Sequence, residues 1–177
     1  MPRTPAHLRS RLLRVQLFLC DVDGVLTDGS VWQGNGVESK RFNIRDGLGL
    51  KFLQHSGIRV GWISRRPSSA TKQRAEDLKI DFLVQSDRGK VSAVESILGK
   101  TKLNWEHICY VGDDVVDLRV LERAGLSVAV ADAVAEVRAA VHYVTRAPGG
   151  RGAIRETVEL ILKAQNKWQQ IISEYAA

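Results

Sequence analysis

The chain has 177 residues, the length of one domain of ordinary size, with no room for two. Hydrophobic residues make up 44% of it and charged residues 26%, with 15 glycines and 4 prolines, so collagen, coiled coil and intrinsic disorder are excluded. Four arginines and no acidic residue lie in residues 1–15, and they supply +4 of the net charge of +6. We expect residues 1–14 to form a basic, solvated leader and residues 15–177 to form a single domain.

A basic segment of this kind also occurs in proteins that bind nucleic acid or an anionic membrane surface. No basic stripe interleaved with aromatic residues follows it, so we expect neither partner. No apolar run approaches the roughly 20 residues that a membrane-spanning helix needs. Cys20 and Cys109 lack metal-binding spacing and are expected to be reduced, which favours a cytoplasmic protein.

Short apolar runs alternate with segments of helical periodicity along most of the chain. Strands are predicted at Val15–Cys20, Ile58–Ile63, Asp81–Val84, His107–Val111 and Leu126–Val130. Helices are predicted at Gly47–His55, Ser68–Leu78, Lys90–Leu98, Asp114–Ala124 and Val134–Ala140, with one long helix over Gly152–Tyr175. Such alternation predicts an α/β fold, a doubly wound Rossmann-like parallel sheet with helices on both faces.

One segment departs from this alternation. Ser30–Ile44 carries a Gly-Asn-Gly turn between two β-like arms, which predicts a β-hairpin flap after the first strand.

Two acidic clusters each follow a buried strand. Asp21 and Asp23 come after the first strand, and Asp113, Asp114 and Asp117 follow the strand at 107–111. Ligands of open parallel sheets bind beyond the carboxyl ends of the strands, so neighbouring strands would bring these carboxylates together. Oxygen ligands without histidine or cysteine are those that Mg²⁺ prefers, and the sequence therefore predicts a magnesium site.

Two further residues at strand ends complete a phosphate site. Ser64 ends the second core strand and precedes a helix, where a hydroxyl and free backbone N–H groups can hold phosphate oxygens. Lys90 begins a helix after the third strand, where its charge would neutralise both a phosphate and a carboxylate nucleophile.

With this order of Asp, Ser, Lys and Asp at successive strand ends, the sequence resembles the haloacid dehalogenase superfamily. More narrowly, it is similar to the 3-deoxy-D-manno-octulosonate 8-phosphate (KDO 8-phosphate) phosphatase family. That resemblance rests on the DVDGVLTDG, NIRDG, GLSVAVADA and GGRGAIRE segments, which begin at residues 21, 43, 125 and 149.

The resemblance implies the role of each residue in the phosphate site. Asp21 would be the nucleophile, and Asp23 would protonate the leaving alcohol and then activate water. Asp21, the backbone carbonyl of Asp23, and Asp113 would hold Mg²⁺. Asp114 and Asp117 would support the site nearby, while Ser64 and Lys90 would bind the phosphoryl oxygens.

The resemblance also implies which residues contact the sugar acid. They are Asn43, Ile44, Arg45, Asp46, Gly47, Arg66 and Arg74, with Lys51 where the family more often has arginine. Arg65 stands where the family usually has glycine after the hydroxyl residue. If that position needed a positive φ, Arg65 would be strained.

The spacing of these motifs leaves no residues for a separate cap domain. The resemblance implies that hairpins of a homotetramer cover the sites, with Val31 and Trp32 at the interface. The glycine-rich segment around Arg151 would fold over a site.

These inferences favour a Mg²⁺-dependent phosphatase that hydrolyses KDO 8-phosphate through an aspartyl-phosphate intermediate, in lipopolysaccharide precursor biosynthesis. One alternative is a phosphatase for a nonulosonate 9-phosphate, since Arg65 and Lys51 lie where substrates would be distinguished. Another is a non-catalytic oligomerisation module, against which the intact set of site residues argues.

Overall fold

The computed structural model describes residues 6–176. Within this range one sheet has the strand order β5-β4-β1-β6-β7-β8, and every neighbouring pair is parallel. One of the two central strands is β1, whose four residues are all buried, as its almost wholly apolar sequence predicts. The strands are β1 (Leu17–Cys20), β4 (Arg59–Ser64), β5 (Phe82–Gln85), β6 (Ile108–Gly112), β7 (Leu126–Ala129) and β8 (Tyr143–Val144).

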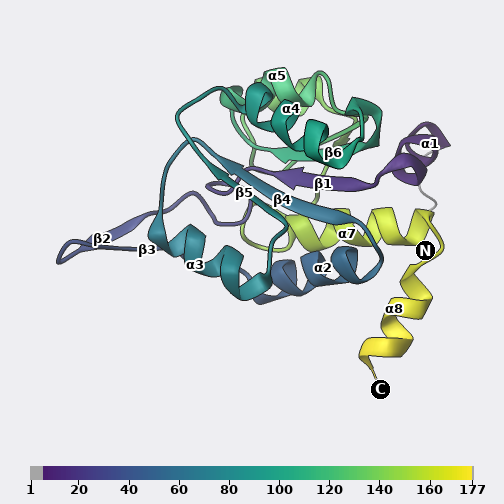
Figure 1. Cartoon of the computed structure of the whole chain (residues 1–177), viewed down its shortest axis with the longest axis horizontal. Helices are drawn as coiled ribbons and strands as arrows, with labels where there is room; N and C mark the ends of the chain where they lie inside the picture. The colour runs from purple at the N-terminus through teal and green to yellow at the C-terminus, as the bar shows by residue number, and fades with distance from the viewer. Residues whose placement is uncertain (1–5, 177) are drawn as a thin grey trace.

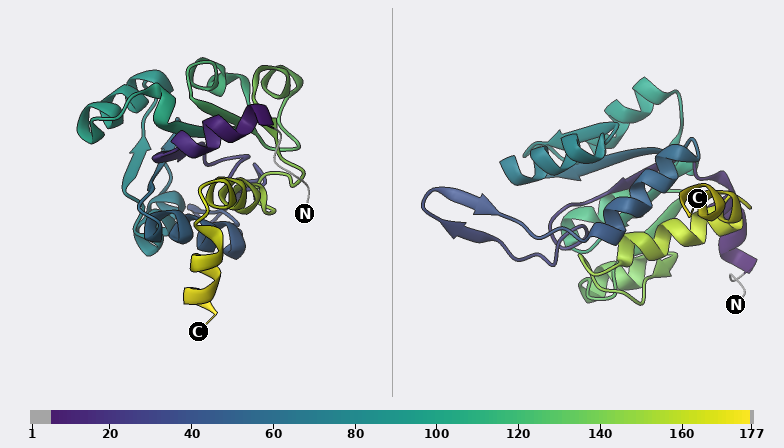
Figure 2. Two further views of the ribbon diagram at one scale, coloured as in Figure 1. Left: turned by 90° about the vertical axis from the view of Figure 1, so that its right-hand side faces the viewer. Right: turned by 90° about the horizontal axis from the view of Figure 1, so that it is seen from below.

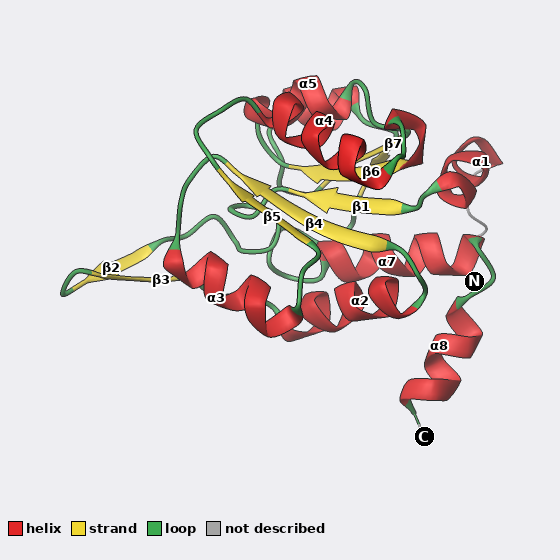
Figure 3. Ribbon diagram, in the orientation of Figure 1, coloured by secondary structure: helices red, strands yellow, loops and turns green. Residues whose placement is uncertain are grey.

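Helices cover both faces of this sheet, which confirms the doubly wound α/β fold (Figure 1). One face carries α2 (Ile44–His55), α3 (Ser69–Leu78) and α7 (Ala153–Ala164). The other face carries α4 (Lys90–Thr101), α5 (Leu118–Leu121) and α6 (Ala135–Ala140), and short 3₁₀ helices lie at Trp105–His107 and Val115–Asp117. Figure 3 shows the loops that join the strands to these helices. Asp21 and Asp113 directly follow the last residues of β1 and β6.

The predicted hairpin is present and extends away from the sheet (Figure 2). Its arms are β2 (Trp32–Gly34) and β3 (Val37–Ser39), which pair antiparallel. At the turn Asn35 has φ 50° and Gly36 has φ 73°, a left-handed conformation that asparagine and glycine adopt most readily.

The prediction of one long helix over residues 152–175 is wrong. The segment forms α7 and a second helix, α8 (Trp168–Tyr175), which leaves the body of the domain at an angle. The break occurs at Asn166, which has φ 57°, and Lys167 N–H donates to the carbonyl of Leu162 at 2.9 Å. A left-handed asparagine ends a helix because it turns the chain away from the helix axis.

The amino-terminal segment is more ordered than a solvated leader. Residues 1–5 lie outside the described range, and α1 (Ala6–Arg14) follows. Leu8 and Leu12 of this helix are buried in the core, and the side chain of Gln165 donates to the carbonyls of Leu12 and Val15. Among residues 6–176, no helix combines the length and the apolar character needed to cross a bilayer.

The glycine-rich segment before α7 packs against the loop that follows β1. Gly150 N–H donates to the carbonyl of Val25 at 2.9 Å, and a Cβ added at Gly149 would lie 1.7 Å from the carbonyl oxygen of Gly24. We therefore expect Gly149→Ala to lower the free energy of unfolding by about 1–3 kcal/mol, because the two backbones must separate. The urea midpoint measures this change.

Gly99→Ala is the matched control for that substitution. A Cβ at Gly99, inside α4, would meet nothing within 4 Å. Alanine there should leave stability unchanged or raise it by up to about 1 kcal/mol. Equal urea midpoints for wild type and Gly149→Ala would contradict the close packing of this segment.

Candidate active site

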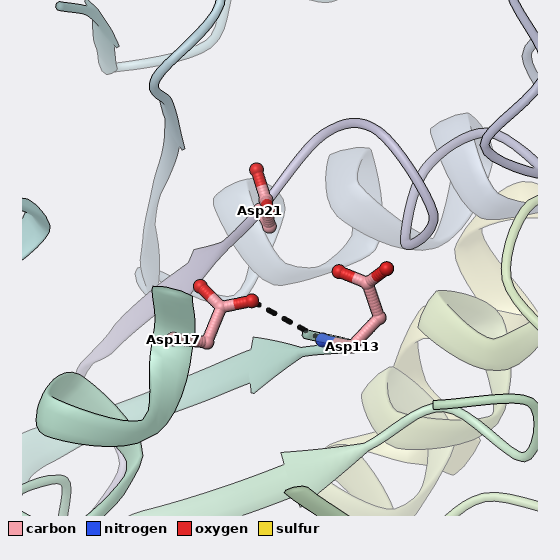
Figure 4. A group of neighbouring side chains, drawn as sticks. All are labelled: Asp21, Asp113 and Asp117. Carbon is pink, nitrogen blue, oxygen red and sulfur yellow. Dashed lines mark hydrogen bonds between the residues drawn. The ribbon is translucent and has the colours of Figure 1, made fainter. Parts of the chain in front are cut away.

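Three aspartates from separate parts of the chain meet at the carboxyl edge of the sheet (Figure 4). Asp21 follows β1, Asp113 follows β6, and Asp117 ends the 3₁₀ helix after β6. Since β1 and β6 are parallel neighbours, with Cys20 paired to Val111, their ends lie side by side. One oxygen from each carboxylate lies within 4.8 Å of the others.

Lys90, the first residue of α4, is the cation that faces this cluster. Its side chain is 2% exposed, and Nζ lies 2.6 Å from Oδ2 of Asp21 and 2.7 Å from Oδ1 of Asp117. Burial alone would lower the pKa of Lys90, but the charges of Asp117 and Asp21 raise it above its ordinary value. The lysine therefore remains an ammonium ion in contact with Asp21.

Asp117 is fully engaged by other groups rather than turned toward the cavity. Its Oδ1 also accepts a hydrogen bond from the hydroxyl of Tyr110 at 2.7 Å, and its Oδ2 accepts from the backbone N–H of Asp113 at 3.2 Å. It thus holds Lys90 and the start of the Asp113 loop in place. Tyr110 was not predicted as a site residue, because in the sequence it is one more apolar-type residue of a buried strand.

The two remaining carboxylates resist ionisation. Burial, reinforced by the charges of Asp21 and Asp117, raises the pKa of Asp113 to about 8. Burial also raises the pKa of Asp21 to about 6, although Lys90 opposes the shift. Negative charge therefore accumulates here beyond what one lysine offsets.

A divalent cation fits this arrangement. Oδ1 of Asp113 is buried without a hydrogen-bond partner, and its other oxygen lies against the backbone of Gly24, where a Cβ would come within 2.0 Å. The Asp113 carboxylate is thus held beside the loop of Asp21 and Asp23. All the available donors are oxygens, the set that Mg²⁺ prefers. Asp21 and Asp113 are placed to hold the ion, with the Asp23 carbonyl as the expected third protein ligand.

These shifts predict an unusual pH dependence for the metal-free protein. Because the folded-state pKa values of Asp21 and Asp113 lie above the unfolded value of 3.8, the folded state binds more protons between those limits. The stability that these two carboxyl groups contribute is fully present below their pKa in the unfolded state. It is lost as the pH rises to their pKa in the folded state. With chelator present, the contribution of Asp21 should therefore be lost by about pH 6, and that of Asp113 should continue to lower the urea midpoint up to about pH 8.

Asp113→Asn and added Mg²⁺ serve as controls for that experiment. The substitution should remove most of the fall, because the amide does not ionise. Mg²⁺ at pH 8.5 should restore the wild-type midpoint, because it binds only the folded state. A chelated wild-type midpoint that rises with pH over this range would contradict the assignment.

A cavity of about 380 Å³ contains this site. Ser64, at the end of β4, is buried, and its hydroxyl accepts from the backbone N–H of Arg66 at 3.1 Å. Arg65 is exposed at the cavity and does not have a positive φ, so the strain considered for an arginine at this position is not present. The lining residues are Asp21, Asp23, Ser64, Arg65, Arg66, Asp87, Lys90, Asp113, Asp114 and Val116.

Asp114 and Asp23 lie at the edges of this cavity. Asp114 is exposed, and its Oδ1 accepts from the N–H of Val115 at 2.6 Å, which caps the short 3₁₀ helix. The carboxylate of Asp23 lies 2.7 Å from the ammonium of Lys40. The side chain of Lys40 is buried, and this residue was not predicted as part of the site.

Of the residues expected to contact the sugar acid, only Arg66 lines this cavity, where it pairs with Glu38. Asn43, Ile44, Arg45 and Arg151 line a different cavity of about 800 Å³. Arg74 lies against Gly47 and pairs with Asp77, and Lys51 is exposed on α2. Within one chain, these residues are therefore not gathered around the phosphate site.

Two of those residues have local roles in the structure. The side chain of Asn43 caps α2 by accepting from the N–H of Arg45 at 2.8 Å. Asp46 is buried, and its oxygens accept from the N–H groups of Gly152 at 3.1 Å and Arg155 at 2.8 Å. Asp46 thereby caps the start of α7, and it lines neither of the two cavities described above.

Known proteins resemble this chain over most of its length. Residues 82–153 match the haloacid dehalogenase-like hydrolase family. A 3-deoxy-D-manno-octulosonate 8-phosphate phosphatase of Yersinia pestis is 44% identical over 158 residues, covering 89% of this chain and 84% of the relative. That of Escherichia coli (strain K12) is 44% identical over 163 residues, covering 92% of this chain and 87% of the relative.

Solved structures agree with the sequence comparison. The crystal structure of the 3-deoxy-D-manno-octulosonate 8-phosphate phosphatase of Moraxella catarrhalis holds a magnesium ion, a phosphate ion and KDO. It superposes with a TM-score of 0.94 at 36% identity, covering 97% of this chain and 99% of that one. Together with the Asp21, Lys90 and Asp113 geometry, these findings show that the chain belongs to the KDO 8-phosphate phosphatase family of the haloacid dehalogenase superfamily.

Proposed function

We propose that this protein is a Mg²⁺-dependent phosphatase that converts KDO 8-phosphate to KDO and inorganic phosphate, in lipopolysaccharide precursor biosynthesis. The observation that carries the proposal is the meeting of Asp21, Lys90 and Asp113 in one cavity. The relatives of Yersinia pestis and Escherichia coli are named for this activity, and the crystal structure of the Moraxella catarrhalis relative contains magnesium, phosphate and KDO. These findings support KDO 8-phosphate as the substrate. The two buried free thiols, Cys20 and Cys109, support a cytoplasmic setting.

The first step is attack of Asp21 on phosphorus. An oxygen of its carboxylate forms a bond to the phosphoryl group while the bond to the sugar oxygen breaks, and Asp23 gives that oxygen a proton. Lys90, 2.6 Å from Asp21, offsets the repulsion between the carboxylate and the phosphate dianion. Mg²⁺, when bound by Asp21, Asp113 and the Asp23 carbonyl, neutralises charge on the phosphoryl oxygens.

The second step hydrolyses the aspartyl phosphate. Asp23, now a carboxylate, takes a proton from the attacking water, whose oxygen displaces Asp21 from phosphorus. Ser64 and Lys90 lie in the same cavity and would bind phosphoryl oxygens through both steps. Asp117 keeps Lys90 in place, and Asp114 holds the following turn.

The sugar acid is proposed to be bound with the help of a neighbouring subunit in a homotetramer. Arg66 is the expected sugar-acid ligand that lies at the phosphate cavity, and the others lie elsewhere on the chain. The projecting hairpin leaves Trp32 69% exposed and Val37 64% exposed, a costly arrangement for a hairpin with no partner. Sedimentation at working concentration tests this point, and a monomer would contradict it.

Phosphate release from KDO 8-phosphate in the presence of Mg²⁺ tests the proposed function. The panel includes nonulosonate 9-phosphates and simple sugar phosphates. We expect KDO 8-phosphate to have the highest kcat/KM, and chelation of Mg²⁺ to abolish the activity. Preference for a nonulosonate 9-phosphate would retain the mechanism and reassign the substrate, with Arg65 as the residue to exchange for glycine.

A further inference from the structure

Lys40, at the base of the hairpin, is a buried lysine with a defined set of partners. Its side chain has no exposed surface. Its ammonium lies 2.7 Å from Oδ1 and 3.0 Å from Oδ2 of Asp23, and 3.2 Å from the hydroxyl of Thr71. Burial of a lysine without compensation is very costly, so these contacts hold the ammonium in one place.

The other carboxylate near Lys40 is already engaged. Glu38 lies 3.8 Å from the ammonium, but its oxygens pair with Arg66 and accept from the hydroxyl of Ser68, the latter at 2.7 Å. The short contacts of Lys40 to a carboxylate are therefore those to Asp23.

The Asp23 carboxylate in turn depends on Lys40. Its side chain is 25% exposed at the cavity, and among residues 6–176 no other side chain makes an ion pair or hydrogen bond with it. Asp23 lies in the loop after β1 and directly precedes Gly24, whose φ is 83°. An aspartate side chain can occupy several staggered rotamers, so the backbone alone does not fix its direction.

We propose that Lys40 is a positioning residue that holds the carboxyl group of Asp23 in the direction of the leaving oxygen of the substrate, to which Asp23 in its acid form gives the proton. The inference rests on the proposed function, in which Asp23 passes a proton to that oxygen. Lys40 also joins Asp23 to the hairpin and to α3, since Thr71 lies in that helix. A shift of the hairpin base would move the proton donor with it.

The test compares leaving groups, because only a poor leaving group needs the proton. The value of kcat/KM reports only the steps up to formation of the aspartyl phosphate. The later hydrolysis of this intermediate therefore does not affect the comparison between the two esters. Lys40→Met should lower kcat/KM for phenyl phosphate by about 100-fold and that for 2,4-dinitrophenyl phosphate by less than about threefold. Lys40→Arg, which keeps a donor for Asp23, should recover part of the loss.

Lys72→Met is the matched control, because Lys72 is an exposed lysine of α3 that pairs with Glu76 at 3.9 Å. It should change neither rate constant. Equal losses for both esters in Lys40→Met would overturn the proposal, since they would show a general disturbance of the site. If Lys40→Met does not fold, Lys40→Gln replaces it with the same expected difference between esters, and again equal losses would overturn the inference.

This experiment separates the inference from the proposed substrate. Wild-type protein that hydrolyses aryl phosphates but not KDO 8-phosphate would remove the proposed substrate and leave the Lys40 comparison intact. Suppose instead that wild-type protein hydrolyses KDO 8-phosphate and that Lys40→Met lowers kcat/KM equally for both aryl phosphates. The proposed substrate would then stand and the positioning role of Lys40 would be overturned.

Discussion

Asp21→Asn is expected to lower kcat for KDO 8-phosphate by at least about 10⁵-fold, the scale seen when a nucleophile is removed. An amide oxygen does not attack phosphorus as a carboxylate does, and the substitution also removes a proposed Mg²⁺ ligand. The fold should survive, because asparagine keeps the acceptor for the N–H of Val22, which lies 2.6 Å from Oδ1. Phosphate release and circular dichroism measure the two effects.

Asp87→Asn is the control for that substitution. Asp87 lines the same cavity but has no place in the mechanism, so its loss should change kcat by less than about fivefold.

A second experiment detects the aspartyl phosphate itself. After reaction with a phosphate-labelled substrate and quenching in acid, wild-type protein should carry the label and Asp21→Asn should carry none. Turnover by Asp21→Asn close to that of wild type would show that another group attacks phosphorus.

Lys90→Met is expected to have the second largest effect, on both rate and stability. It leaves the carboxylates of Asp21, Asp113 and Asp117 together without the ammonium that two of them contact. Breaking a buried ion pair by removing one partner costs about 3–5 kcal/mol of unfolding free energy. Loss of a charge that stabilises the transition state should also lower kcat/KM by about 10²–10³-fold.

Urea unfolding at pH 7 with chelator and steady-state kinetics with Mg²⁺ measure these losses. Lys163→Met is the comparison, because Lys163 makes a solvent-exposed pair with Glu159 at 2.6 Å, which is worth less than about 1 kcal/mol. Equal losses of stability in the two variants would show that Lys90 does not hold the aspartates together.

The fold could be predicted because its signals are local. The apolar residues of β1 indicate a strand covered on both faces, and Asn35 with Gly36 indicates a tight hairpin turn. The phosphate site follows from the same signals, since residues at the ends of neighbouring parallel strands meet at one edge. Asp21 and Asp113 are close for that reason alone.

The features that could not be predicted depend on contacts between distant segments. In the sequence, Lys40 is one of several charged residues of the hairpin. Only the structure shows that the base of the hairpin lies beside Asp23. The sequence likewise indicates only a core residue at Tyr110, and the structure shows that its hydroxyl donates a hydrogen bond to Asp117. The helical periodicity of residues 152–175 gives no sign of the left-handed backbone at Asn166.

The cap that Asp46 provides for α7 has a consequence for folding. The N–H groups that Asp46 accepts from belong to residues 106 and 109 positions later in the chain. During synthesis, the side of α2 that packs against α7 stays uncovered until α7 has been made. Closure of this long loop is an entropic barrier, so docking of α7 is expected to be late and slow. Until then the part of α2 that α7 covers in the finished fold remains in contact with solvent.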